Sequence, residues 1–107
     1  MTTEEFIVED SGQREHFTSG AVRDTQEGKT RYDLISPYAL RRIGDHMTKG
    51  ALKYGERNWE KGMPRSRFIA SALRHLYKWI MGSREEDHLA AVCFNIMAIM
   101  HFEEQED

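Results

Sequence analysis

The stretch that decides the fold is residues 36–55, SPYALRRIGDHMTKGALKYG. Ser36 followed by Pro37 is typical of a helix start, because a serine oxygen caps free backbone N–H groups and proline fits the first helical position. Apolar residues then recur at helical spacing and predict one apolar stripe; they are Leu40, Ile43, Met47, Ala51 and Tyr54. Gly55 is a typical C-terminal cap. We therefore predict a helix from Pro37 to the residue before Gly55.

Two more helical stripes follow, after a turn-rich connector at residues 56–64. The first starts at Ser66, ends before Gly82 and carries Ile69, Leu73, Leu76, Trp79 and Ile80. The second starts at Ser83, because Glu86 lies at the capping-box spacing from it. Its apolar residues are Leu89, Val92, Cys93, Ile96, Met100 and Phe102. These stripes predict two further helices.

Residues 1–30 differ from the rest in being polar, and they predict a mobile arm. Phe6-Ile7-Val8 is a short element within it that we expect to dock on the body or on a partner. No strand pattern is evident. The fold class is therefore predicted as all-α, a small bundle of about three main helices with a polar, partly disordered N-terminal arm. We place the arm at residues 1–27 and a single helical domain at residues 28–107.

Length and composition limit the class of protein. A chain of 107 residues has room for one domain with a thin core. The lone Cys93 excludes a disulfide framework and a multi-cysteine zinc site. No apolar run is long enough to span a membrane, and no secretory leader is evident. We expect a soluble, cytoplasmic protein. Apolar residues spread around the third helix predict a homo-oligomer.

The net charge of −3 hides a strong asymmetry. Residues 1–30 carry −4, residues 31–82 carry +7 and residues 83–107 carry −6. A basic middle block is suited to phosphates, and the acidic run Glu85-Glu86-Asp87 is suited to a divalent cation. The alternative is that these charges coat solvent-facing helix surfaces, with the acidic run favouring a helix N-terminus.

Several polar residues interrupt the apolar stripes of the second and third helices. Two facing helices could present Arg74, His75 and Lys78 from one side, and Glu85, Glu86, Asp87, His88 and Asn95 from the other. Carboxylates bind Mg²⁺ and basic groups neutralise phosphate, so the set suits metal-assisted attack of water on a phosphoanhydride. The alternatives are a structural histidine pair and an interhelical hydrogen bond from Asn95, since a buried amide needs a partner.

The connector carries a second constellation, Lys53-Tyr54-Gly55 followed by Asn58-Trp59. An exposed aromatic ring beside these donors can stack on a nucleobase while Lys53 meets phosphate. The alternative is that Tyr54 and Trp59 fill the small core, which the spacing alone favours.

Four motifs in order resemble the phage dATP/dGTP diphosphohydrolase family over most of residues 20–104. They are Gly28-Lys29-Thr30-Arg31-Tyr32-Asp33-Leu34-Ile35, Lys53-Tyr54-Gly55 with Asn58-Trp59, Arg74-His75-Leu76 with Trp79, and Glu86-Asp87-His88-Leu89-Ala90 with Asn95. That family is similar to the all-α, MazG-like nucleoside triphosphate pyrophosphohydrolases. The resemblance implies hydrolysis of dATP or dGTP to monophosphate and pyrophosphate with Mg²⁺ or Mn²⁺, in a phage-encoded protein in the host cytoplasm.

The resemblance and the residue patterns described above together imply roles for individual residues. The catalytic set is His75, Glu86 and Asp87, and the metal set is Glu85, Glu86, Asp87 and His88. The substrate-binding set is Lys29, Arg31, Lys53, Tyr54, Asn58, Trp59, Arg74, Lys78 and Asn95.

One departure from the wider superfamily keeps a second function open. The wider superfamily carries an E-E-x-x-E carboxylate motif, which does not occur in the body of this chain. The only carboxylate on the first predicted helix is Asp45. The alternative is therefore a non-catalytic, oligomeric protein that binds and sequesters a nucleotide or cyclic nucleotide. A nucleic-acid adaptor ranks last, because the basic residues are interleaved with core positions and acidic flanks oppose a long polyanion.

Overall fold

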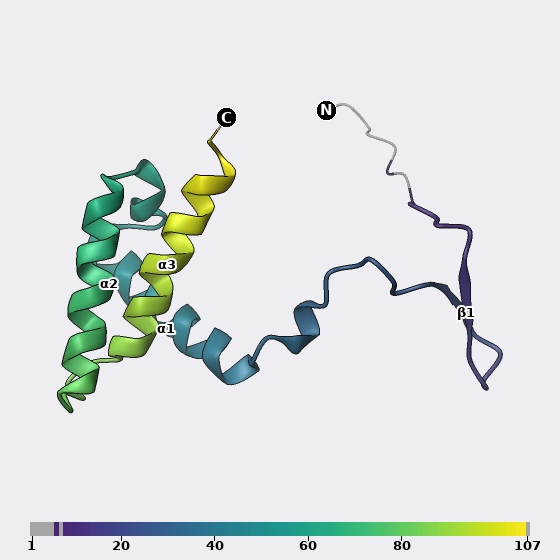
Figure 1. The fold of residues 1–107 in the computed structure, drawn as a ribbon, viewed down its shortest axis with the longest axis horizontal. Coiled ribbons are helices and arrows are strands. Elements are labelled where there is room, and N and C mark those ends of the chain that lie inside the picture. Colours follow the sequence, from purple (N-terminus) through teal and green to yellow (C-terminus); the bar gives the residue numbers. More distant parts are fainter. Residues whose placement is uncertain (1–5, 7, 107) are drawn as a thin grey trace. The chain divides into compact units, whose positions relative to one another are not determined.

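The computed structural model describes residue 6 and residues 8–106. Within that range the elements are β1 (Arg14–His16), β2 (Val22–Asp24), the 3₁₀ helix η1 (Tyr32–Leu34), α1 (Pro37–Tyr54), the 3₁₀ helix η2 (Asn58–Lys61), α2 (Arg65–Ile80) and α3 (His88–Glu104) (Figure 1). The chain divides into two compact units, Met1–Tyr32 and Asp33–Asp107. The predicted domain boundary after residue 27 lies inside the first unit. The second unit is a small helical bundle, which confirms the predicted fold class.

The first unit contains a β-hairpin where the sequence predicted no strand. β1 and β2 pair antiparallel, with Arg14 opposite Asp24 and His16 opposite Val22. Polar contacts hold it: Asp24 accepts from the Ser11 hydroxyl and lies 3.1 Å from Lys29 Nζ. The hydroxyl contact, followed by the lysine contact, lowers the pKa of Asp24. Strands of three residues carry too little alternation to stand out in the sequence.

The Phe6-Ile7-Val8 element is described only at its two ends. Phe6 and Val8 are about nine-tenths exposed, and Ile7 lies outside the described residues. Its docking on the body or on a partner stays a prediction.

Helix α1 has the bounds that the sequence predicts. The Ser36 hydroxyl accepts from the Ala39 N–H at 3.2 Å, and the Gly55 N–H donates to the Ala51 carbonyl at 2.8 Å. Gly55 has φ +95°, a conformation that L side chains rarely adopt, which explains the glycine at this end.

Helix α2 starts at Arg65, one residue before the predicted Ser66, and ends before Gly82 as predicted. The predicted start of the third helix at Ser83 is wrong. Helix α3 starts at His88, and Asp87 is its cap, accepting from the Ala90 N–H at 3.1 Å. Aspartate caps as well as serine does, and here it gains a second partner in Arg42.

Helix α3 packs along α2 and also contacts α1 (Figure 1). Small buried side chains let α2 and α3 approach closely; they are Ala72, Ala90, Ala91 and Ala98. Phe68 on α2 is also buried and stacks on Phe102 of α3, with centroids 6.2 Å apart. Among the described residues the largest fully buried side chain is His88, so the middle of this bundle holds a polar group.

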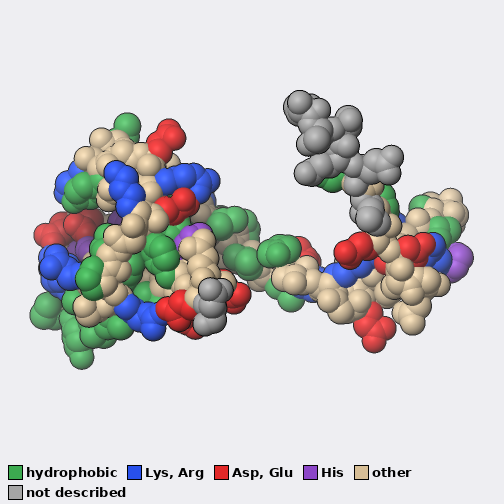
Figure 2. All heavy atoms as spheres, turned by 90° about the horizontal axis from the view of Figure 1, so that it is seen from above, with side chains coloured by type: hydrophobic (Ala, Val, Ile, Leu, Met, Phe, Trp, Pro, Cys, Tyr) green, Lys and Arg blue, Asp and Glu red, His purple; other side chains and the backbone are tan. Residues whose placement is uncertain are grey.

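Much apolar surface remains uncovered on the helical unit. Leu73, Tyr77 and Ile80 follow one side of α2 at helical spacing and are each more than half exposed. Figure 2 shows hydrophobic side chains reaching the surface between basic and acidic ones. None of the described helices combines the length and apolar character that a membrane crossing requires.

Candidate functional site

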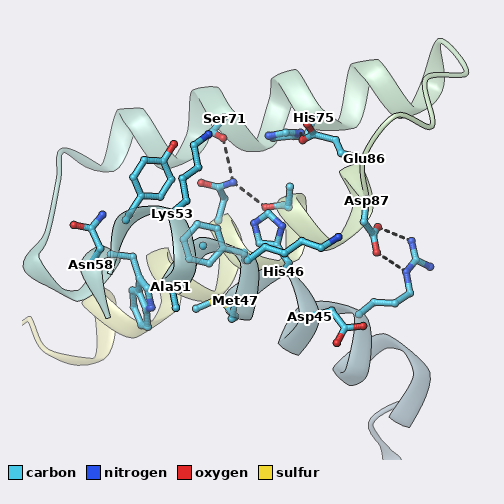
Figure 3. Close-up of a pocket in the computed structure, with 18 of the residues that line it drawn as sticks. Asp45, His46, Met47, Ala51, Lys53, Asn58, Ser71, His75, Glu86 and Asp87 are labelled. Atoms are coloured by element: carbon cyan, nitrogen blue, oxygen red, sulfur yellow. Dashed lines mark hydrogen bonds and ion pairs between the residues drawn. The ribbon is translucent and has the colours of Figure 1, made fainter. Parts of the chain in front are cut away.

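A cavity of about 600 Å³ lies within the helical unit, lined by α1, the connector with η2, α2, and the start of α3 (Figure 3). This volume is in the range of small-molecule sites. Among the described residues its lining includes five basic and three acidic side chains. The basic ones are Arg42, Lys49, Lys53, Arg57 and Arg74, and the acidic ones are Asp45, Glu86 and Asp87. The excess of positive charge favours an anionic ligand.

His75, Glu86 and His88 converge at one end of the cavity. The two Nδ1 atoms of the histidines lie 2.9 Å apart, and Glu86 Oε1 lies 3.3 Å from His75 Nδ1 and 3.7 Å from His88 Nδ1. His75 and Glu86 line the cavity, whereas His88 is buried behind them. Burial lowers the pKa of His75 and outweighs the nearby Glu86 carboxylate, which favours the neutral form of its ring.

The second nitrogen of His88 has its own partners in the loop between α2 and α3. Nε2 of His88 lies 3.0 Å from the Ser83 hydroxyl and 3.9 Å from Glu85 Oε1. Glu85 is mostly exposed and lies outside the described cavity lining. Ser83 therefore orients His88 from behind, and Glu85 stands on the far side of the ring from His75.

Asp87 faces the cavity but both of its oxygens have protein partners. They accept from Nε and Nη2 of Arg42 at 2.8 and 2.6 Å, and one also caps α3. The Arg42 side chain, helped by the Ala90 N–H, lowers the pKa of Asp87 to about 2. Asp87 thus fixes the start of α3 against α1, and these contacts compete with the metal and catalytic roles predicted for it.

Asn95 is buried and lines the cavity. Its amide nitrogen donates to the Ser71 hydroxyl at 3.2 Å and to the Ala91 carbonyl at 2.8 Å. The first contact joins α3 to α2, as the interhelical alternative for Asn95 predicted.

The two aromatic residues at the connector end of the cavity, Tyr54 and Trp59, differ in burial. Trp59 is half-buried and packs edge-on against α3, with ring centroids 6.2 Å from Phe94 and 4.9 Å from His101. Tyr54 is 62% exposed, with Lys53 Nζ 5.1 Å from its ring centroid. The core-filling alternative therefore fits Trp59 and does not fit Tyr54. Asn58 also lines this end of the cavity.

Three other predicted residues, Lys29, Arg31 and Lys78, are not among the described residues that line the cavity. Lys29 belongs to the first unit and pairs with Asp24, and Arg31 belongs to the same unit. Lys78 lies outside the described cavity lining, although its charge contributes to the lowered pKa of His75.

The sequence reasoning missed Arg42 and His46, which line the cavity from α1. The signal was present in the spacing: Arg42, His46, Lys49 and Lys53 recur at helical intervals on one side of α1, away from the apolar stripe.

Comparison with known protein families matches residues 19–107 to the family described as dATP/dGTP diphosphohydrolase, N-terminal. The match includes the whole helical unit and thus the cavity. Neither the curated proteins nor the solved structures give a significant match.

Proposed function

The chain belongs to the dATP/dGTP diphosphohydrolase N-terminal domain family, and from this premise we propose that it hydrolyses dATP or dGTP to the monophosphate and pyrophosphate. The observation that carries this proposal is the family match over residues 19–107, which includes a basic cavity large enough for a small molecule.

The basic side chains of the cavity bind the triphosphate in this proposal. Lys53 from α1 and Arg74 from α2 approach the cavity from two sides, so a chain of phosphates between them meets positive charge along its length. Positioning and charge neutralisation are the main contributions that a protein makes to phosphoryl chemistry.

The His75–Glu86 end is where water attacks. A water oxygen forms a bond to the α-phosphorus, the bond from that phosphorus to the bridging oxygen breaks, and the bridging oxygen leaves with pyrophosphate and the electron pair. Glu86 receives the proton of the water, because its carboxylate lines the cavity at this end, 3.3 Å from His75 Nδ1.

The connector end holds the base. An asparagine amide both donates and accepts hydrogen bonds, so Asn58 can pair with the edge of a purine. Figure 3 shows Asn58 at the opposite end of the cavity from His75 and Glu86, with Lys53 between them in this view. The nucleotide therefore lies along the cavity, with its base at the connector end, its phosphates in the middle and the attacking water at the His75–Glu86 end.

The Mg²⁺ or Mn²⁺ that the resemblance implies was assigned to Glu85, Glu86, Asp87 and His88. The described donors do not fit a magnesium site made of oxygen ligands alone. Asp87 is ion-paired with Arg42, and Glu86 lies beside two imidazoles. No step above depends on protein-bound Mg²⁺. We propose that Mg²⁺ arrives as the counter-ion on the phosphates of the nucleotide.

The test is incubation of the protein with each of the four deoxynucleoside triphosphates and Mg²⁺ or Mn²⁺, followed by anion-exchange chromatography. Equal amounts of monophosphate and pyrophosphate from dATP or dGTP support the proposal. No product from either purine nucleotide overturns it.

A second candidate function is nucleotide binding without turnover. It is favoured by the engagement of Asp87 with Arg42, which removes one predicted catalytic carboxylate. Purine nucleotide recovered intact after denaturing a tight complex supports it, and monophosphate in the same sample excludes it.

We also propose that a second copy of the chain covers the α2 stripe of Leu73, Tyr77 and Ile80. A stripe at helical spacing is self-complementary across a two-fold axis, and covering it adds apolar burial that the small core lacks. Light scattering after size exclusion tests this, with a dimer or higher oligomer expected. A monomer at micromolar concentration contradicts it.

A further inference from the structure

We propose that Nδ1 of His75, Nδ1 of His88 and a carboxylate oxygen of Glu86 form a binding site for a borderline divalent metal ion of the Zn²⁺ class. The site lies at the end of the cavity where we propose that water attacks. Its role in hydrolysis therefore rests on the proposed function.

The separations of the three ligand atoms match those around one ion. Zn²⁺ binds imidazole nitrogen and carboxylate oxygen at about 2.0–2.2 Å, so two ligands at tetrahedral angles lie about 3.3–3.6 Å apart. The three observed separations are 2.9, 3.3 and 3.7 Å. They bracket the tetrahedral value, so an ion fits with small side-chain adjustments.

The orientation of His88 also favours a ligand at Nδ1. Its Nε2 lies 3.0 Å from the Ser83 hydroxyl oxygen, which accepts a hydrogen bond when that nitrogen carries the proton. In that tautomer Nδ1 of His88 carries a lone pair, and this nitrogen lies 2.9 Å from Nδ1 of His75 and 3.7 Å from Glu86 Oε1. A histidine ligand commonly donates its other N–H to such a partner, which fixes the ring and its basicity. Ser83 therefore acts as a positioning residue.

The donor set decides which ion is favoured. Mg²⁺ prefers oxygen ligands and keeps its waters, whereas two imidazoles with one carboxylate suit Zn²⁺ and neighbouring transition metals. Three protein ligands leave a coordination position open, as in catalytic zinc sites. Because His75 and Glu86 line the cavity while His88 is buried behind them, the open position faces the cavity.

Such an ion would supply a bound water of lowered pKa, or polarise a phosphoryl oxygen, at the water end of the cavity. Only one carboxylate oxygen of Glu86 would bind the ion, so the other stays available for the proton of the water. The competing explanation is a metal-free hydrogen-bonded trio, in which a proton rather than an ion lies between the two histidines. The two explanations differ in metal affinity, and that difference is directly measurable.

The experiment uses the full chain without a polyhistidine tag, dialysed against a chelator and then titrated with Zn²⁺ by calorimetry. We expect one Zn²⁺ per chain and a rise in Tm when Zn²⁺ is added, with no rise for Mg²⁺ at the same concentration. Absence of saturable Zn²⁺ binding overturns the proposal.

Variants test the ligands without relying on buried His88. Glu86→Gln changes an exposed side chain and should lower Zn²⁺ affinity at least tenfold, as should His75→Gln. Glu104→Gln, an exposed glutamate at the other end of α3, is the matched control and should bind like the wild type. Wild-type affinity in both ligand variants, or an equal loss in Glu85→Gln, contradicts the ligand set.

The outcomes separate the two proposals. Zn²⁺ binding with no hydrolysis of any purine triphosphate supports the metal site and overturns the proposed function. Hydrolysis that continues in a protein unable to bind Zn²⁺ supports the function and overturns the metal site.

Discussion

The two ends of the cavity are built in opposite ways. At the α2–α3 junction, His75, Glu86 and His88 contact one another directly, and Asp87 is locked to Arg42. At the connector end, Lys53 and Tyr54 are exposed, with Lys53 Nζ 5.1 Å from the Tyr54 ring centroid. The junction is therefore arranged before any ligand arrives, whereas the connector end offers side chains that can still reorient.

This contrast suggests that the junction carries out the chemistry and that the connector end binds the base and the phosphates. Chemistry needs groups held in place, because reorganisation during reaction raises the barrier. Binding of a base and phosphates tolerates side chains that close onto the ligand. We expect substitutions at the junction to reduce kcat or stability, and substitutions at the connector end to raise KM.

The largest effect is expected for Glu86→Gln. Loss of the carboxylate that receives the water proton should lower kcat by roughly a hundredfold or more, since general bases contribute factors of that order. Steady-state kinetics with dATP and dGTP measure it. A variant with wild-type kcat would show that the junction is not the chemical end.

Next is Asp87→Ala, which removes both the cap of α3 and the ion pair with Arg42. A lost cap costs about 1 kcal/mol and a partly exposed ion pair up to about 1 kcal/mol, so we expect unfolding to be easier by about 2 kcal/mol. Ser36→Ala, which removes only the cap of α1, should cost about 1 kcal/mol. Urea unfolding compares the two, and an equal cost would mean that the Arg42 contact adds nothing.

The Asp87 contribution should depend on pH in a defined window. Its folded pKa of about 2 lies below the ordinary value of 3.8, so its carboxylate stabilises the fold above about pH 4. The contribution is lost as the pH falls from 4 to 2. The Tm difference between wild type and Asp87→Asn should therefore shrink across this range, and a constant difference would contradict the assignment.

A smaller effect is expected for Lys53→Ala at the connector end. Losing one charged contact to phosphate should raise KM about tenfold and leave kcat nearly unchanged, because the contact holds substrate and transition state alike. Lys61→Ala, in the connector that follows α1 and outside the described cavity lining, is the control. A fall in kcat instead of a rise in KM would place Lys53 in the chemistry.

The smallest effect is expected for Asn58→Ala. One neutral hydrogen bond to a base corresponds to about a threefold to tenfold change in KM. The ratio of KM for dATP to KM for dGTP should change as well, since the two purines present different edges. An unchanged ratio would remove Asn58 from base recognition.

The helical part of the fold was predictable because its signals are local. Ser36-Pro37 and Gly55 mark the ends of α1, apolar stripes mark α1 and α2, and apolar residues at roughly helical spacing mark α3. The start of α3 was missed because Ser83 and Asp87 are both good caps, and only the tertiary contact with Arg42 distinguishes them. The hairpin was missed because side-chain contacts to Asp24, rather than apolar alternation, hold it.

The sequence predicted which residue types form the site, but it predicted less well which side chains contact one another. The sequence placed His75, Glu86 and His88 on facing elements, but it could not show that both Nδ1 atoms and the carboxylate converge. It also could not show that Asp87 turns toward α1. Such pairings depend on side-chain directions between elements, which helical spacing does not determine.

The central claim is that water attacks the α-phosphorus of a purine deoxynucleoside triphosphate at the Glu86 end of the cavity. The most direct measurement is hydrolysis of dATP and dGTP in H₂¹⁸O, with mass spectrometry of both products. The account predicts ¹⁸O in the monophosphate and none in pyrophosphate, with product formation greatly reduced in Glu86→Gln and retained in Glu104→Gln. Label in pyrophosphate, release of inorganic phosphate instead, or no product at all would contradict it.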